Sequence, residues 1–272
     1  MRDPGIRTIN SFFTEALATE LVGQGRPADV IHANNVLAHV PDLNGFVAGI
    51  ATLLADDGVA SIECPHAMEL IEHCEFDTIY HEHLCYFTVT ALRPLFARHG
   101  LVLKDVRQLP IHGGSLRLYV GHEPGESDAV RALLAEEERR RLDTPEGYLS
   151  FGKEVMDLRA KLRQLIASLK ADGKTIAAYG AAAKGATMLN YTGIGVDSLD
   201  FVVDRNTHKH GRYMPGQNLP IHPTEVLLEK QPDYCLMLAW NFEKEILEQQ
   251  AEYRKRGGRF IVPVPEPRII EE

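Results

Sequence analysis

Residues 28–37, with the sequence ADVIHANNVL, have the composition of a buried strand that ends in polar residues. Apolar residues then recur at helical spacing over residues 43–54, and Asp56-Asp57-Gly58 ends that helix. Residues 59–63, VASIE, form a second strand. This alternation of strand and helix predicts an α/β fold in which helices cover a mostly parallel sheet. Ligands of such sheets bind beyond the carboxyl ends of the strands.

Polar side chains gather after each of these two strands. They are Asn34, Asn35 and His39 after the first strand, and Glu63, Cys64 and His66 after the second. Because the carboxyl ends of parallel strands meet at one edge of a sheet, we expect a single polar rim there. For Asn34 and His66, capping or core hydrogen bonds are the stronger explanation.

Residues 76–87, FDTIYHEHLCYF, follow this rim and place four titratable side chains in a row. These are Tyr80, His81, Glu82 and His83. A histidine takes up or releases a proton near neutral pH, and a neighbouring carboxylate fixes its tautomer and raises its basicity. The segment therefore predicts acid–base chemistry. The alternative is a surface turn whose histidines have no chemical role.

The first half of the chain is predicted to form one domain over residues 1–122. The elements predicted around its sheet are an extended segment at 8–13, helices at 14–22 and 90–99, and an antiparallel hairpin of strands at 101–106 and 115–120. A sheet that closes with such a hairpin is familiar from class I methyltransferases. The first domain is therefore predicted to be an incomplete, Rossmann-like sheet of this class.

The second half is predicted to form another α/β, Rossmann-like domain over residues 123–272. Its first residues, 123–143, are polar and predict a solvated helix with no partner. The other predicted elements are a long helix at 148–170, strands at 175–179, 199–204, 234–238 and 259–263, and a helix at 243–257.

Residues 180–185, GAAAKG, join a strand of this second domain to a helix predicted to begin near Ala186. Small residues let backbone amides approach a phosphate, while the helix dipole and the charge of Lys184 favour an anion. The segment matches neither the P-loop nor the GxGxxG pattern. Tight packing of strand against helix explains the same small residues, so both interpretations stay open.

Composition excludes several classes of protein. With 38 acidic and 29 basic residues, the net charge of -9 argues against a general nucleic-acid binder. The sequence has no apolar run of membrane-spanning length and no signal peptide at its start, so we expect a cytoplasmic protein without a membrane partner. Its four cysteines lack CxxC spacing and suit reduced thiols better than a disulfide framework or a zinc site.

Four segments together resemble a family of SAM-dependent sugar C-methyltransferases, which act on nucleotide-linked 4-keto deoxysugars. The matching segments are residues 28–42, 76–87, 111–117 and 179–185. They occur in order over most of the chain, which makes the resemblance more specific than any single motif. In this family a middle domain binds SAM on a Rossmann-like sheet, and the carboxy-terminal α/β domain helps to hold the nucleotide sugar.

The resemblance implies a role for each candidate residue. His83 is expected to be the general base that removes the proton from carbon 3 of the sugar, giving an enolate. Glu82 and Tyr80 are expected around the sugar, and His39 is a second histidine at the same rim. For substrate binding, Asn35 is expected to donate a hydrogen bond to a sugar oxygen, and Lys184 to contribute its charge.

The sequence also departs from the family pattern. It lacks the cysteine-rich zinc-binding domain, the glycine-rich first strand and turn that hold SAM, and the acidic residue for its ribose. We therefore expect an incomplete SAM site with no assignable cofactor-binding residue, in a chain that is a truncated form of a longer enzyme. Zinc is expected only if the amino-terminal domain exists.

Two other functions stay open. One is a non-catalytic remnant that still binds the nucleotide sugar, which the missing glycine-rich turn favours. The other is a metal site built from His81, Glu82 and His83, but no second cluster has ligand spacing, so no metal is predicted. The sequence does not determine the sugar, the nucleotide, the stereochemistry at carbon 3 or the oligomeric state.

Overall fold

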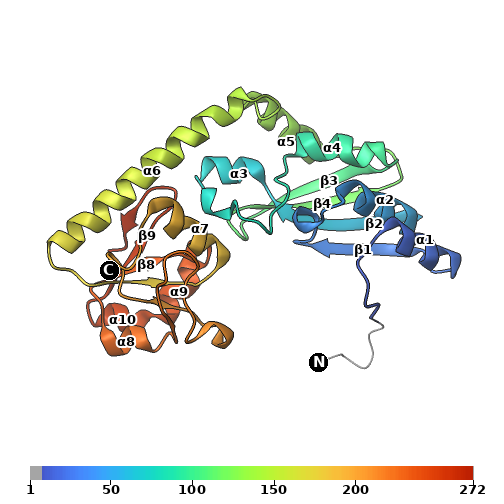
Figure 1. The fold of residues 1–272 in the computed structure, drawn as a ribbon. Coiled ribbons are helices and arrows are strands. Elements are labelled where there is room, and N and C mark those ends of the chain that lie inside the picture. Colours follow the sequence, from blue (N-terminus) through green and yellow to red (C-terminus); the bar gives the residue numbers. More distant parts are fainter. Residues whose placement is uncertain (1–7, 272) are drawn as a thin grey trace. The chain divides into compact units, whose positions relative to one another are not determined.

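The protein is described by a computed structural model that covers residues 8–271, and its chain divides into two units (Figure 1). The first unit runs to Pro65 and includes Leu84–Leu109 and Ser115–Asp143. The second unit contains His66–His83, Pro110–Gly114 and the chain from Thr144 onward. Each unit has its own sheet, so the chain is a mixed α/β protein with two Rossmann-like parts, as the sequence predicts.

The first unit contains a four-stranded sheet in the order β1-β2-β4-β3. Its strands are β1 (Ala28–Asn34), β2 (Leu54–Pro65), β3 (Val102–Leu109) and β4 (Ser115–Gly121). Only β1 and β2 pair in parallel, while β4 is antiparallel to both β2 and β3. The predicted closing hairpin is confirmed. The prediction of a mostly parallel sheet is wrong for this unit, because the hairpin supplies two of the three pairings.

Strand β1 forms one edge of this sheet, and this position changes its environment. Only Ala33 is buried along the strand, and the side chain of Val30 is 64% exposed. The prediction of a buried strand is therefore wrong. A strand composition rich in apolar residues does not reveal whether the strand lies at the centre or the edge of a sheet.

The described part of the first unit also contains helical elements. They are α1 (Glu15–Gly23), the short 3-10 turn η1 (Leu37–His39), α2 (Leu43–Leu53), α4 (Val89–Arg98) and α5 (Asp128–Arg139). Thr14 and Asp42 cap the helices α1 and α2 through their side-chain oxygens. Residues 8–13 form no strand, and residues 54–58, predicted to end a helix, begin β2.

Helix α5 is more than the solvated helix that its charges predict. Val130, Leu133 and Glu137 are buried on its inner face. The Glu137 carboxylate accepts hydrogen bonds from the backbone N–H groups of Val89 and Thr90, both at 2.7 Å, at the start of α4. Through this contact residues 123–143 belong to the first unit, which differs from the domain boundary predicted after residue 122.

The second unit is built on a six-stranded sheet in the order β10-β9-β8-β5-β6-β7. Its strands are β5 (Ile176–Tyr179), β6 (Val202–Val203), β7 (Ile221–His222), β8 (Tyr234–Met237), β9 (Arg259–Val262) and β10 (Arg268–Ile269). All pair in parallel except β10, which is antiparallel to β9. The strand order reverses between β5 and β8, and ligands of doubly wound sheets bind beyond such a point.

The helical elements of this unit are α3 (Ala67–Glu72), η2 (Phe76–Thr78), α6 (Glu146–Ala171), α7 (Ala183–Thr192), η3 (Thr207–Lys209), α8 (Val226–Lys230), η4 (Trp240–Phe242), α9 (Glu243–Gln249) and α10 (Ala251–Lys255). The predicted helix at 243–257 is thus two helices. Helix α7 begins before Ala186, which places Lys184 in its first turn. No helix of the described chain is long and apolar enough to cross a membrane.

The core of the second unit includes the start of the segment 76–87, which contains His81 and His83. Helix α6 contributes buried residues at helical spacing, among them Leu158, Leu162 and Ile166. Cys74 and Phe76 pack into the same core, and the ring of Phe76 lies 5.0 Å from that of Tyr191 on α7. The segment that leads to His83 is therefore anchored on the second α/β unit.

Candidate active site

Tyr80 and His83 contact each other in a turn directly after η2. The N–H of His83 donates to the carbonyl of Tyr80 at 3.0 Å, which closes the turn. This brings the phenol oxygen of Tyr80 within 3.2 Å of Nε2 of His83, with ring centroids 4.4 Å apart. Nδ1 of the same imidazole lies 2.9 Å from the backbone carbonyl of Thr78. Both side chains are half-buried.

These contacts determine which nitrogen of His83 is basic. A carbonyl oxygen only accepts hydrogen bonds, so Nδ1 carries the hydrogen that Thr78 receives. Neutral imidazole then presents a lone pair on Nε2, toward the Tyr80 hydroxyl. Burial raises the pKa of Tyr80, and the charges of Glu82 and Asp77 raise it further, so its phenol stays protonated and donates. The arrangement is that of an oriented base with an adjacent donor.

His81 and Glu82 lie between these two residues in the chain, and both side chains are exposed. The structure therefore brings Tyr80 and His83 together, while Glu82 acts on Tyr80 through its charge. Among residues 8–271 no group of three or more His, Cys, Asp or Glu side chains is arranged to hold a metal ion.

A buried carboxylate lies directly before this turn. Asp77, the middle residue of η2, is fully buried and accepts a hydrogen bond of 2.8 Å from Nε1 of Trp240. Burial raises its pKa to about 6, against the opposing influence of Lys184 and of the Trp240 hydrogen bond. Glu75 is also buried, and burial raises its pKa to about 8. Sequence reasoning assigned no role to these residues.

Lys184 faces this acidic pair from the first turn of α7. Its Nζ donates to Oδ1 of Asn241 at 2.7 Å and lies 3.9 Å from the centre of the Trp240 ring. Burial lowers the pKa of Lys184, while the carboxylates of Asp77 and Glu75 oppose that shift. Since α7 follows β5 and η4 follows β8, Lys184 and Trp240 lie where the strand order of the second sheet reverses.

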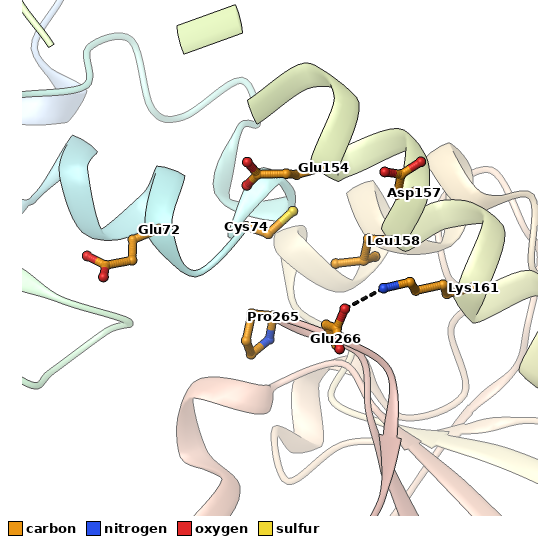
Figure 2. Close-up of a pocket in the computed structure, with 8 residues that line it drawn as sticks. All are labelled: Glu72, Cys74, Glu154, Asp157, Leu158, Lys161, Pro265 and Glu266. Carbon is orange, nitrogen blue, oxygen red and sulfur yellow. Dashed lines mark hydrogen bonds and ion pairs between the residues drawn. The ribbon is translucent and has the colours of Figure 1, made fainter. Parts of the chain in front are cut away.

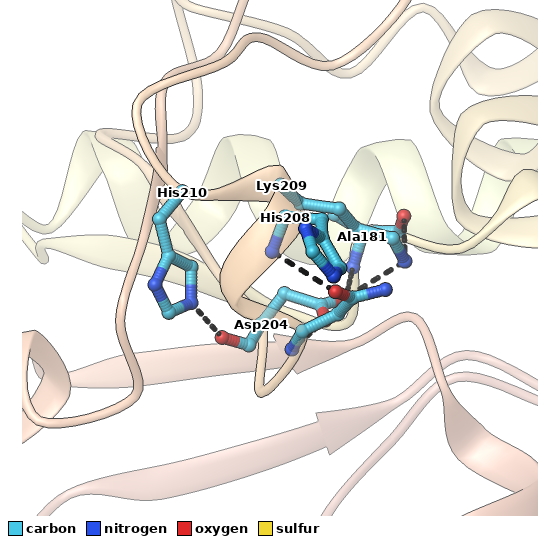
Figure 3. A network of polar contacts seen from close by, with 6 residues as sticks. Ala181, Asp204, His208, Lys209 and His210 are labelled. Atoms are coloured by element: carbon cyan, nitrogen blue, oxygen red, sulfur yellow. Dashed lines mark hydrogen bonds and ion pairs between the residues drawn. The ribbon is translucent and has the colours of Figure 1, made fainter. Parts of the chain in front are cut away.

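The loop before Lys184 is closely packed. Gly180 has φ +101, and a Cβ there would lie 2.7 Å from Cβ of Ala239, so no other residue fits. The N–H of Ala181 donates to Oδ2 of Asp204 at 2.6 Å. Figure 3 shows this contact, together with Lys209, whose Nζ donates to the Ala181 carbonyl at 2.8 Å. Tight packing thus explains the glycine at the start of residues 180–185.

Asn35 and His39 lie in the first unit, after β1. Asn35 has φ +53 and donates its N–H to the carbonyl of Glu63 at 2.9 Å, which extends the pairing of β1 with β2. His39 is the last residue of η1, and both side chains are exposed. Nearby, the N–H of Leu84 donates to the carbonyl of Ala38 at 2.8 Å. The candidate residues therefore form two groups, one in each unit.

The second unit also contains a cavity of about 320 Å³ (Figure 2). Its lining residues are Glu72, Cys74, Glu154, Asp157, Leu158, Lys161, Pro265 and Glu266. Lys161 and Glu266 form an ion pair across it. Burial and the charges of Glu154 and Asp77 raise the pKa of the Cys74 thiol to about 11, so the thiol is protonated and inert at neutral pH. No predicted site residue lines this cavity.

Comparison with known proteins agrees with this architecture of two α/β units. The family described as "C-methyltransferase C-terminal domain" matches residues 110–265, and the family described as "Methyltransferase domain" matches residues 3–106. The chain belongs to the C-methyltransferase family, which confirms the resemblance carried by its motifs.

One relative is C-methyltransferase NovU of Streptomyces niveus, which is 37% identical over 271 residues, covering 98% of this chain and 64% of NovU. The chain thus spans 64% of the length of this curated relative. Among solved structures, the crystal structure of M1.HpyAVI aligns with a TM-score of 0.27 and 17% identity over 40% of this chain and 51% of that chain. That likeness is too low to carry an argument.

Proposed function

We propose that this chain takes part in SAM-dependent C-methylation of a nucleotide-linked 4-keto deoxysugar, through an enolate. The observation that carries the proposal is the His83 imidazole, whose Nδ1–H donates to the Thr78 carbonyl and whose Nε2 is therefore the basic nitrogen. Membership of the C-methyltransferase family supports the methyl transfer. Forming a carbon–carbon bond needs a carbon nucleophile, and an oriented base supplies one from a ketone.

The chemistry of this chain is the removal of a proton. The carbonyl at carbon 4 acidifies the C–H bond at carbon 3, and Nε2 of His83 takes that proton while the electron pair moves into the enolate. In the free protein the Tyr80 hydroxyl bonds Nε2 at 3.2 Å. When the substrate C–H takes its place at Nε2, the hydroxyl turns to a sugar oxygen. A donor to the enolate oxygen contributes about 3 kcal/mol to the barrier reduction.

The methyl donor is not assigned to residues of this chain. SAM, when bound, supplies an electrophilic methyl group. In the described part of the chain, however, β1 is followed by Asn35 and η1, and β2 by His66 and α3, so neither strand leads into a glycine-rich turn.

Four further roles belong to the proposal. Glu82, exposed next to His83 in the chain, accepts from a sugar hydroxyl. In the first unit, Asn35 donates to a sugar oxygen and His39 provides a second histidine for proton transfer. Lys184, which uses one N–H on Asn241, adds positive charge for the diphosphate of the nucleotide at the start of α7.

Exchange of the carbon 3 proton for deuterium tests the proposal without any methyl donor. The chain is incubated in D2O with a dTDP-linked 4-keto-6-deoxysugar, and the signal at carbon 3 is followed by proton NMR. We expect exchange well above the rate in buffer, and its loss in His83→Asn but not in His81→Asn, the exposed neighbour. An exchange rate equal to that in buffer overturns proton abstraction.

A non-catalytic nucleotide-sugar-binding protein is the second candidate, and the lack of a glycine-rich turn after β1 and β2 favours it. Calorimetric titration with the same dTDP-sugar separates the two. Binding without exchange at carbon 3 supports the second candidate, while binding with His83-dependent exchange supports catalysis.

A further inference from the structure

The tautomer of His83 depends on where the carbonyl of Thr78 points. Thr78 is the last residue of η2, and its N–H and hydroxyl both donate to the carbonyl of Glu75, at 3.0 and 2.8 Å. The N–H of Ile79 donates to the carbonyl of Phe76 at 3.0 Å. These bonds close η2 into a hydrogen-bonded turn and constrain its backbone. Whatever holds the turn also sets the direction of the Thr78 carbonyl.

Two contacts hold η2 on the second unit. Phe76 packs against Tyr191 on α7, and Asp77 bonds Nε1 of Trp240 in η4. Oδ1 of Asp77 is buried and has no hydrogen-bond partner in the described part of the chain, so Trp240 is the side chain that fixes this carboxylate. Trp240 is fixed in turn, since Lys184 lies over its ring and bonds Asn241.

We propose that Asp77 and Trp240 are positioning residues that hold His83 in the tautomer with its hydrogen on Nδ1. The path runs from the Trp240 indole to the Asp77 carboxylate, through one peptide unit to the Thr78 carbonyl, and across 2.9 Å to Nδ1 of His83. Neutral histidine can carry its hydrogen on either nitrogen, so a fixed acceptor at Nδ1 selects the form with basic Nε2.

This assignment explains why a carboxylate persists in an unfavourable environment. A buried carboxylate with one hydrogen bond from a neighbouring side chain is costly, and an apolar residue of the same size would avoid that cost. Such an apolar residue could not accept the hydrogen bond from Trp240. Its importance for catalysis rests on the proposed role of His83 as base, whereas the tautomer is a property of the free protein.

The test is nitrogen-15 NMR of the histidine rings in the full chain, without substrate, with the His83 signals assigned from His83→Asn. In the native protein we expect a protonated Nδ1 and an unprotonated Nε2. Trp240→Phe removes only the N–H donor, and Asp77→Ala removes the acceptor. Both should shift the Nε2 resonance toward the protonated range as the two tautomers mix. Asp77→Asn retains an oxygen for Trp240 and should keep the native tautomer.

Phe242→Leu, a change of an exposed ring in the same turn η4, is the matched control and should leave both resonances unchanged. Carbon 3 exchange in Trp240→Phe should fall about 10- to 100-fold with unchanged KM, as expected for a misplaced base. Native tautomer signals in both Trp240→Phe and Asp77→Ala would overturn the proposal, even if carbon 3 exchange falls in these variants. Absent exchange in the native protein bears on the proposed function alone, because the tautomer is measured separately.

Discussion

Glu137 in the first unit and Asp77 in the second are both fully buried carboxylates, but their surroundings differ. Glu137 accepts from two backbone N–H groups and the Thr90 hydroxyl, each at 2.7 Å, at the start of α4. Asp77 accepts from Trp240 and retains an oxygen without a partner among the described residues. A well-satisfied carboxylate stabilises its fold, whereas a poorly satisfied one next to a candidate base indicates a function.

The largest effect is expected at the base itself. His83→Asn should lower carbon 3 exchange by about 10²- to 10⁴-fold, the usual contribution of a general base. Its free energy of unfolding should change little, because the half-buried ring lies in a surface turn. Exchange by NMR and urea unfolding of the same sample measure both. A His83→Asn protein that is folded and exchanges at the native rate would remove His83 from the mechanism.

Glu137→Ala should have the opposite effects to His83→Asn, with a loss of stability and no loss of exchange. It leaves the amide donors of Val89 and Thr90 buried without their acceptor, and the free energy of unfolding should fall by about 3 kcal/mol. Carbon 3 exchange per folded molecule should be unchanged. Glu138→Ala, at the exposed neighbouring position, is the control and should change stability by less than about 0.5 kcal/mol. An equal effect of the two substitutions would contradict a structural role for Glu137.

Asp77→Asn should stabilise the protein at neutral pH. The folded pKa of Asp77 is raised, to about 6, so the folded state binds the proton more tightly than the unfolded state does. The native protein therefore loses stability as the pH rises from about 4 to about 6. Asn resembles the protonated form and avoids that loss, which amounts to about 3 kcal/mol for a pKa raised from 3.8 to about 6.

Urea unfolding of Asp77→Asn and of the native protein at pH 4 and pH 7 measures this difference. The free energy of unfolding of the variant, relative to that of the native protein, should increase from pH 4 to pH 7. If the variant is less stable at pH 7 than at pH 4, relative to the native protein, ionised Asp77 stabilises the fold and resembles Glu137.

The features that local sequence predicts well are those made by nearby residues. Thr14 caps α1, and α6 follows the apolar spacing of residues such as Leu158 and Leu162. Even the Tyr80–His83 contact spans three positions, within one turn. Such contacts depend on backbone geometry that a short segment specifies by itself.

Features made by distant residues could not be predicted in this way. The bond between Asp77 and Trp240 joins positions 163 residues apart, and Glu137 meets α4 across 48 positions. The polar pattern of α5 gave no sign that one of its glutamates is buried. The exposure of β1 depends on its place in the strand order, which needs the pairing of the whole sheet.

The smallest effect is expected at Asn35, where the two roles of one residue can be separated. Its side chain is a proposed donor to a sugar oxygen, and its backbone adopts φ +53, a conformation that disfavours alanine. Asn35→Gly removes the donor without strain, and Asn35→Ala adds a strain of about 1 kcal/mol. Both should raise the KM for carbon 3 exchange by about threefold, because water replaces a single donor at an exposed position. Only Asn35→Ala should lower stability. If KM is unchanged in both variants, Asn35 acts through its backbone alone, and the first unit loses one of its two proposed contacts with the sugar.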